Sequence, residues 1–444
     1  MPSNAELPFL KTRLSVMMFL EFFIWGAWFP LSFGYVPSLG FEGAEKYAIL
    51  SAFNVSALIA MFFSNQFADR NFAAQKFMSF SHLIGGLAML GLFWVRKPEG
   101  AASANFWLFF GLLAIHTLFY VPTISISNSI AFANLRDPAK EFGPIRMWGT
   151  IGWIAAAWPF VFILIDWAKV PAMGDVGFVQ WLGDALGTSL KGDALRHATG
   201  YTFVASGVAS LLLSLISLTL PNTPPKPASE SGGSALAWAE AFSLLRHPFV
   251  LVLFVVTFLD ATLLQMYFYW TPSYLEKAAG VPGNWIMPAM SVGQIAEILT
   301  MAVLGYVLKS LGWRLTMVIG ILGHAARFTV FAFFPAVIPA VAVNLLHGIC
   351  YAFFFATVYI FVDEFFPKDI RSSAQGLFNM LILGAGPLMG NFLCEQIAEF
   401  FPRGTPTDQF RTWFLFPAGT ALFAALLLLL FFHPPKRAET AKVI

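Results

Sequence analysis

The chain has 444 residues, of which 58% are hydrophobic and 11% are charged, and its formal net charge at neutral pH is +2. A soluble domain carries about 25% charged residues, so this composition excludes a water-soluble globular protein, as does a mean hydropathy of +0.71. We expect a polytopic membrane protein. The small net charge and the lack of a basic, aromatic-interleaved patch give no indication of nucleic-acid binding.

Apolar runs long enough to cross a bilayer as helices recur along the whole chain. They predict twelve spans, at about residues 14–37, 47–67, 77–95, 104–132, 145–167, 200–220, 248–275, 284–308, 314–334, 336–362, 373–399 and 409–432. A Pro-, Gly- and Ser-rich linker divides them into six and six. We therefore expect an all-α membrane protein with a six-helix bundle at 1–220, a cytoplasmic linker at 221–247 and a second six-helix bundle at 248–444.

Basic residues in the loops predict the orientation of the spans. With both termini in the cytoplasm, fifteen Lys and Arg residues fall on the inner side and nine on the outer side. Two more, Arg146 and Arg327, fall inside spans. A polar insert at 168–199 lies on the outer side in this arrangement. We therefore predict a multi-pass protein with both termini cytoplasmic.

The fifth predicted span opens with the sequence GPIRMWGTIGW, which places an arginine inside an apolar run. Burying a guanidinium costs roughly 2.5–3.5 kcal/mol on insertion scales, so Arg146 either faces protein or water or reaches the nearby cytoplasmic surface. Helical spacing puts Arg146, Thr150 and Trp153 on one face, which predicts the wall of a polar cavity. Gly149 and Gly152 leave the adjacent face bare, so we expect another helix to approach closely there.

Five more polar side chains lie at membrane depth, namely Glu21, Asp260, Gln265, Gln294 and Glu297. Each carboxylate has two interpretations. It can be the structural partner of a buried arginine, or it can load and unload protons, and both can hold at once. The proton-coupling candidates are Glu21, Glu297 and Asp260. For Glu297 we favour a functional role, because Gln294 shares its helix face and adds a neutral donor and acceptor suited to a ligand.

Aromatic rings on the same helix faces add a second feature of this predicted site. Trp153, Trp25 and Tyr351 lie beside the amide and carboxyl groups. Flat rings next to hydrogen-bonding groups suit a ligand with a planar apolar part and polar edges, such as a nucleobase, and they suit a stacked sugar equally well.

Nothing in the sequence indicates a metal site, a cofactor or an enzyme. Cys350 and Cys394 lie in apolar runs and are expected to pack rather than to form a disulfide or bind metal. His82, His116 and His347 stand alone on apolar faces and are expected to be core residues. The chain has no HExxH, GxSxG or P-loop motif.

Several motifs resemble known transporter families. The loop NQFADR, residues 65–70, resembles the loop between spans 2 and 3 of the major facilitator superfamily, with Asn65 in place of the usual glycine. The resemblance implies that Asp69 and Arg70 form a conformational latch, and the alternative is a solvated loop pair. Motifs from four spans resemble the bacterial nucleoside:proton symporters, a branch of that superfamily: FLEFFIWGAW (19–28), YVPT (120–123), GPIRMWGTIG (143–152) and IRSSAQGLF (370–378).

This resemblance covers nearly the whole chain and implies a substrate site. In that family, the nucleoside site is lined by the residues that match Arg146, Thr150, Trp153, Gln265, Gln294 and Glu297. Tyr351 matches an aromatic residue of span 10. The resemblance implies proton-coupled import of nucleosides across the bacterial cytoplasmic (inner) membrane by alternating access, driven by the proton gradient without a cofactor. The expected partners are the nucleoside and membrane lipid, without nucleic acid, and the chain is expected to be a monomer.

The chain also departs from the family pattern. An acidic residue of span 10 is Ala352 here, a tyrosine is His347, and an asparagine of span 7 is Phe268. Conversely, a glutamine of span 1 is Glu21. These changes suggest that proton coupling has moved to Glu21 or Glu297, and they leave the choice of nucleoside open. The alternative is a major-facilitator transporter of another small polar solute, such as a sugar or a modified nucleoside.

Overall fold

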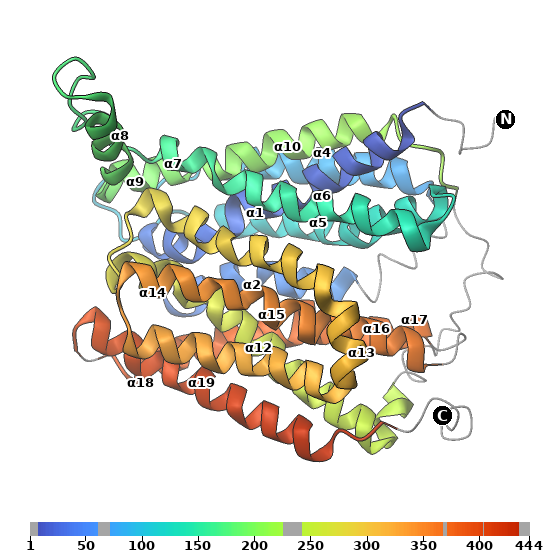
Figure 1. Cartoon of the computed structure of the whole chain (residues 1–444). Helices are drawn as coiled ribbons and strands as arrows, with labels where there is room; N and C mark the ends of the chain where they lie inside the picture. The colour runs from blue at the N-terminus through green and yellow to red at the C-terminus, as the bar shows by residue number, and fades with distance from the viewer. Residues whose placement is uncertain (1–7, 61–71, 225–241, 367–370, 403, 435–444) are drawn as a thin grey trace. The chain divides into compact units, whose positions relative to one another are not determined.

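The computed structural model describes residues 8–60, 72–224, 242–366, 371–402 and 404–434. This part of the chain is helical (Figure 1), apart from an isolated bridge between Ile165 and Ser189. It forms two compact units. Unit 1 comprises Met1–Pro225 with Leu275–Ser291, and unit 2 comprises Lys226–Tyr274 with Val292–Ile444.

The helices begin and end close to the predicted spans. In chain order up to the linker they are α1 (Leu10–Ser38), α2 (Gly43–Ile59), α4 (Ala74–Leu92), α5 (Phe106–Asn134), α6 (Pro138–Ala157), α7 (Pro159–Ile163), α8 (Phe178–Gly187), α9 (Gly192–Thr199) and α10 (Tyr201–Ser217). After the linker they are η3 (Leu244–Arg246), α12 (Pro248–Lys277), η4 (Gly283–Trp285), α13 (Ile286–Phe333), α14 (Val337–Ala342), η5 (Val343–Leu345), α15 (Leu346–Cys350), η6 (Tyr351–Ala356), α16 (Thr357–Phe365), α17 (Arg371–Asn379), η7 (Met380–Ala385), α18 (Gly386–Phe400) and α19 (Pro406–Phe431).

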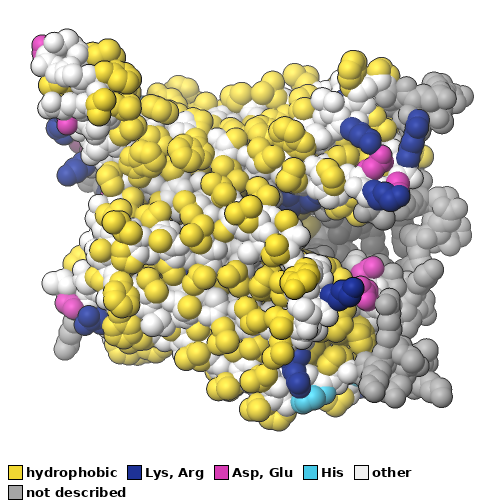
Figure 2. All heavy atoms as spheres, in the orientation of Figure 1, with side chains coloured by type: hydrophobic (Ala, Val, Ile, Leu, Met, Phe, Trp, Pro, Cys, Tyr) yellow, Lys and Arg dark blue, Asp and Glu magenta, His cyan; other side chains and the backbone are white. Residues whose placement is uncertain are grey.

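Eight helical segments of the described chain are long and apolar enough to cross a membrane. They cover α1, α5, α9–α10, α12, η4–α13, α14–α16, α17–α18 and α19. Hydrophobic side chains dominate the visible surface over these helices, and Lys, Arg, Asp and Glu gather near helix ends (Figure 2). An all-helical membrane protein is therefore confirmed. Both cysteines are free and buried, as expected.

Small residues allow the helices of unit 1 to approach closely. α1 packs along α6, and α4 packs against α5 and α10. A Cβ atom added at Gly152 would lie 2.1 Å from the main-chain oxygen of Phe19, and one at Gly149 would lie 2.7 Å from the ring of Phe22. The close approach predicted at these two glycines is therefore confirmed, and α1 is the helix that makes it.

Serines spaced four residues apart on α10 bond to the main chain of neighbouring helices. Ser206 donates to the Ile24 oxygen of α1 at 2.8 Å. Ser210 and Ser214 donate to the oxygens of His82 and Ser79 on α4, at 2.9 and 2.7 Å. Hydroxyl groups at helix spacing hold apolar helices together where water is absent.

Two kinds of irregularity interrupt the helices of unit 2. α13 continues across two predicted spans, but Gly312 has a φ of 72° and a ψ of 175°, a conformation that glycine adopts at no steric cost. The break lies between the predicted spans 284–308 and 314–334. The other irregularities are the π-helical segments η6 and η7, and such segments occur frequently at functional sites.

The connection between α12 and α13 belongs to unit 1, where it contacts the polar insert. Asn284 donates through Nδ2 to the main-chain oxygens of Val161 and Leu186, at 3.2 and 3.0 Å. The indole N–H of Trp285 donates to the same Leu186 oxygen at 2.9 Å. η4 is thus fixed to α7 and α8 by uncharged donors on backbone acceptors.

Two predictions fall mainly outside the described residues. Asp69 and Arg70, the predicted latch, lie outside them, as does most of the predicted linker, residues 225–241. The latch and the domain boundaries at 1–220, 221–247 and 248–444 stay predictions.

Candidate functional site

The predicted site residues lie on helices of both units. In unit 1, α6 carries Arg146, Thr150 and Trp153, and α1 carries Glu21. In unit 2, the predicted residues are Asp260 and Gln265 on α12, Gln294 and Glu297 on α13, and Tyr351 at the start of η6. The convergence of the two sets on one chamber stays a prediction.

Arg146 of unit 1 lies against an aromatic surface. Its guanidinium carbon is 3.9 Å from the centre of the Phe22 ring, a cation–π contact that compensates in part for lost water. Farther along α6, the Trp153 ring meets Trp25 edge to face at 5.2 Å, and Trp25 stacks on Phe53 at 4.7 Å. The face of α6 that carries the cation therefore adjoins a set of flat rings on α1 and α2.

Glu21 is buried on the opposite side of α1, among α4, α5 and α10. Its Oε2 lies 3.0 Å from Nε2 of His82, and its Oε1 lies 2.8 Å from the hydroxyl of Thr123, which also donates to the main-chain oxygen of Tyr120 at 2.5 Å. The Tyr120 hydroxyl donates to the main-chain oxygen of Glu21 at 2.6 Å. Both Glu21 and His82 are completely shielded from solvent. The partner of Glu21 is thus a histidine, and the alternative that it neutralises a buried arginine is not what the structure shows.

The bonds around His82 determine how many protons it shares with Glu21. Ser210 has one hydroxyl hydrogen, which goes to the main-chain oxygen of His82 because a carbonyl can only accept. The Oγ of Ser210 also lies 3.1 Å from Nδ1 of His82, so Nδ1 must be the donor there. One further proton then lies between Nε2 and the carboxylate, and it belongs either to an imidazolium or to a carboxylic acid. Nε2 of His82 and Oε2 of Glu21 therefore share a proton in a site shielded from solvent.

Unit 2 buries a cation instead. Arg327 is wholly buried and donates through Nη1 to Nδ1 of His347 at 3.1 Å and through Nη2 to Nδ1 of His324 at 2.8 Å. Its guanidinium carbon also lies 3.8 Å above the Tyr267 ring. The carboxylate nearest to this group is Asp260, whose Oδ2 is 3.7 Å from Nε2 of His324. Neither oxygen of Asp260 has a hydrogen-bond donor among the described residues.

The two predicted glutamines of unit 2 have different surroundings. Gln265 donates to Oδ1 of Asn391 at 2.7 Å, so its amide is engaged within the unit. The amide of Gln294 lies 3.4 Å from Nε2 of His347, which connects it to the Arg327 cluster. Gln294 is buried and Glu297 is partly exposed one helical turn later. Sequence spacing could not identify the neighbour of Gln294 on α15, and the ligand-binding role of Gln294 stays a prediction.

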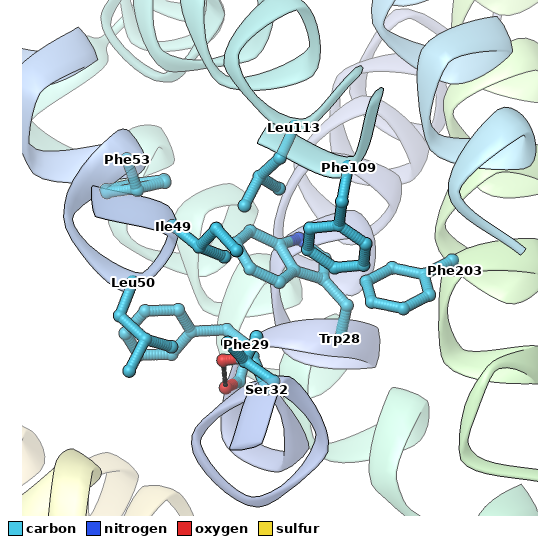
Figure 3. Close-up of a pocket in the computed structure, with 10 residues that line it drawn as sticks. Trp28, Phe29, Ser32, Ile49, Leu50, Phe53, Phe109, Leu113 and Phe203 are labelled. Carbon is cyan, nitrogen blue, oxygen red and sulfur yellow. Dashed lines mark hydrogen bonds between the residues drawn. The ribbon is translucent and has the colours of Figure 1, made fainter. Parts of the chain in front are cut away.

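A small cavity in unit 1 is a different feature. Figure 3 shows Trp28, Phe29 and Phe109 among its lining side chains, together with the Ser32 hydroxyl, which is turned back to the Phe29 oxygen at 2.7 Å. Its volume of about 10 Å³ is close to the minimum for a single water molecule. It is apolar and far too small for a nucleoside, so it is a packing defect and not the predicted site. Among the described residues, no group of three metal-binding side chains is placed to hold an ion.

Comparison with known proteins identifies the family. The model of the nucleoside H⁺ symporter family matches residues 9–173 and 164–437. The chain belongs to this family. YegT of Escherichia coli (strain K12) is 30% identical over 441 residues, covering 97% of this chain and 95% of YegT. The xanthosine permease of the same organism is 27% identical over 451 residues, covering 97% and 98% of the two chains.

Solved structures of a nucleoside transporter share the fold. Crystal structures of the nucleoside transporter NupG match with TM-scores of 0.77 and 0.74 at 24% identity, covering 96% of this chain and 100% of NupG. The predicted family and an all-helical membrane fold shared with NupG are therefore confirmed. Family membership also confirms that the chain is a transporter and not an enzyme. The residues of the substrate site are not tested by this likeness.

The residues that sequence analysis underestimated are histidines. His82 and His347 were expected to be core residues, and they are, but the sequence did not identify the polar partners that each has at both ring nitrogens. The sequence did contain an indication of these contacts. The chain has only 7 histidines, and a histidine inside a span needs hydrogen-bond partners from the protein because water is absent there. Their partners lie 20 to 128 residues away, and sequence spacing cannot reveal such pairs.

Proposed function

We propose that this member of the nucleoside H⁺ symporter family imports nucleosides together with protons across the inner membrane of a bacterium by alternating access. In this proposal twelve helices cross the membrane as two six-helix halves, both termini are cytoplasmic, and a monomer is the working unit. The proton gradient is the driving force and no cofactor takes part. Family membership supports the proposal, as do relatives described as a nucleoside permease and a xanthosine permease.

The ligand site that we propose combines residues of both halves. Arg146 and Thr150 contact the polar edge of the ligand, and Trp153 and Tyr351 stack on it or shape the pocket. Gln265, Gln294 and Glu297 hydrogen-bond to it. The aromatic surface beside Arg146 supports the stacking role, because rings and a cation on adjoining faces suit a flat, polar-edged molecule.

We assign proton coupling first to Glu21, and the observation that carries this assignment is its shared proton with His82. A pair that holds one proton in a dry site can release it only when the surrounding helices move or water enters. Glu21 also precedes Phe22, whose ring lies under Arg146. A shift of α1 that follows a change in the protonation of Glu21 would therefore also move the ring that contacts Arg146 at the proposed ligand site. Asp260 and Glu297 remain the other candidates, and Asp260 has a permanent cation close by through His324.

Uptake into proteoliposomes tests the proposal. Radiolabelled uridine is expected to accumulate when the outside is acidified. Glu21→Gln is expected to reduce this accumulation by about 10-fold or more, because an amide can keep hydrogen bonds but does not titrate. Exchange of uridine at equal pH on both sides is expected to continue. The control is Glu141→Gln, which neutralises a carboxylate in the first turn of α6 in the same unit. Protein with this substitution should accumulate uridine normally.

The outcomes separate the alternatives. Unchanged gradient-driven accumulation and pH profile in Glu21→Gln would remove Glu21 from coupling and leave Glu297 and Asp260. Competition by hexoses or modified nucleosides, but not by uridine or adenosine, would replace the nucleoside by another small polar solute. The absence of uptake for every solute would contradict the transport function itself.

A further inference from the structure

The Arg327 cluster determines the protonation of its two histidines. A guanidinium has only N–H donors and does not lose its proton in proteins. Arg327 donates to Nδ1 of both His324 and His347, so both Nδ1 atoms are acceptors. Each neutral ring then carries its hydrogen on Nε2. The state of the two histidines is therefore set by a charge that does not titrate.

The same argument extends from His347 to Gln294. The Nε2–H of His347 points to the Gln294 amide at 3.4 Å, and only the amide oxygen can accept this hydrogen. The orientation of an amide follows from its hydrogen-bond network, so the oxygen faces His347 and the NH₂ group is turned away. The other end of the amide has no hydrogen-bond partner among the described residues, although Gln294 is only 6% exposed.

We propose that His347, held by Arg327, fixes Gln294 as a hydrogen-bond donor toward the ligand and thereby selects ligands with an acceptor at that point. A buried, unpaired NH₂ group is unfavourable, and a carbonyl oxygen of the ligand at that point satisfies it. A ligand amino group at the same point meets a second donor and is rejected. The nucleoside identity of the ligand rests on the proposed function, whereas the orientation of Gln294 does not.

The surroundings of the cluster make it rigid. The Tyr267 ring lies under the guanidinium, and its hydroxyl donates to Oδ1 of Asn344 at 3.0 Å. On the other side, His324 accepts from Arg327 at 2.8 Å, and its Nε2 lies 3.7 Å from Oδ2 of Asp260. His347 and Arg327 are thus positioning residues, and Gln294 is the group that meets the ligand.

Nucleosides provide matched pairs that test donor selection. Uridine and inosine carry a carbonyl oxygen where cytidine and adenosine carry an amino group, an acceptor in place of a donor. We expect uridine and inosine to inhibit uptake about 10-fold or more strongly than cytidine and adenosine, because a donor site rejects ligands that leave it unpaired. Equal inhibition by the two members of each pair would overturn the proposal.

Two substitutions of His347 separate positioning from a purely structural role. In His347→Asn the amide oxygen can still accept from Arg327 at the place of Nδ1, but the shorter side chain has no donor for Gln294. In His347→Gln the longer amide can do both. We expect the carbonyl preference to fall to within about 2-fold in His347→Asn, because Gln294 can then turn over, and to persist in His347→Gln. A full preference in His347→Asn would overturn the proposal.

A measurement without ligand keeps the proposal distinct from the proposed function. In protein labelled with ¹⁵N-histidine, His347 is assigned from the spectrum of His347→Gln. We expect a neutral ring protonated at Nε2, and a ring protonated at Nδ1 or at both nitrogens would overturn the proposal. If no nucleoside is taken up while the Nε2 hydrogen is found, the proposed function fails and the orientation of Gln294 stands.

Discussion

Each unit buries a polar cluster around histidine, and the two clusters differ in the partner of the ring. In unit 1 His82 faces a carboxylate, Glu21, at 3.0 Å. In unit 2 His324 and His347 both face the guanidinium of Arg327, at 2.8 and 3.1 Å. The carboxylate leaves one proton to be shared, whereas the guanidinium supplies hydrogens that it never gives up.

The difference separates two tasks that the sequence does not distinguish. A pair that shares a proton can change its charge state when water reaches it, so the unit 1 cluster suits coupling. A cluster built on a permanent cation keeps its hydrogens in place at any physiological pH, so the unit 2 cluster suits recognition. Substitutions should therefore affect proton dependence in unit 1 and stability or selectivity in unit 2.

The largest effect on stability is expected at Arg327. Arg327→Met leaves Asp260 in the protein interior without a compensating cation, and removing one partner of a buried pair costs about 3–5 kcal/mol. Asp260→Asn in the same protein should restore a large part of the loss. The measurement is the free energy of unfolding in detergent. If the double variant is as unstable as the single one, Asp260 is not the counter-charge and the comparison of the two clusters must be redrawn.

A smaller effect, equal in the two units, is expected where helices meet at glycine. A Cβ at Gly152 would collide with Phe19 of α1, and one at Gly348 would lie 2.4 Å from the main chain of Ala296. Gly152→Ala and Gly348→Ala should each lower the free energy of unfolding by roughly 1–3 kcal/mol, the usual cost of overpacking.

Two open positions serve as matched controls for the glycine variants. A Cβ added at Gly111 of α5 or Gly305 of α13 meets no atom within 4 Å, so alanine there should be neutral or stabilising by up to about 1 kcal/mol. An equal decrease in the free energy of unfolding at all four positions would show that the effect comes from the helix backbone and not from the close approach of the helices.

The smallest effect is expected at an ion pair near the surface of unit 1. Glu141 accepts from exposed Lys11 at 2.6 Å, and hydrogen bonds from Lys11 and from the backbone of Asp137 lower the pKa of its carboxyl group. The resulting stabilisation is present above the usual pKa of glutamate and is lost as the pH falls through the lowered pKa. Glu141→Gln should therefore remove a small part of the acid sensitivity of unfolding and leave stability at pH 7 nearly unchanged. A larger loss of stability at acidic pH than at pH 7 would contradict this sign.

Much of the fold could be predicted from the sequence because lipid imposes simple rules. Apolar length located the long helices, and bare glycines predicted a close helix contact on α6 without identifying α1 as the partner. The break at Gly312 falls between two predicted spans. The segments η6 and η7 could not be foreseen, because a π-helical turn depends on the packing around it.

The candidate site was predictable only in part. The cost of burying charge singled out Glu21, Asp260 and Arg327. It could not tell which partner each would find, because His82 is 61 residues from Glu21 and helix packing brings them together. The orientation of the Gln294 amide depends on His347, whose protonation depends in turn on Arg327. No pattern in a single sequence encodes such a series of contacts.

The contact of η4 with the insert has a consequence for how the transporter responds to acid. Its donors are the amide of Asn284 and the indole of Trp285, and its acceptors are backbone oxygens of Val161 and Leu186. None of these groups titrates, and salt screens only charges. A change of pH or of salt concentration therefore leaves this contact intact, and a response to pH has to begin elsewhere, as at Glu21 and His82, which share a proton.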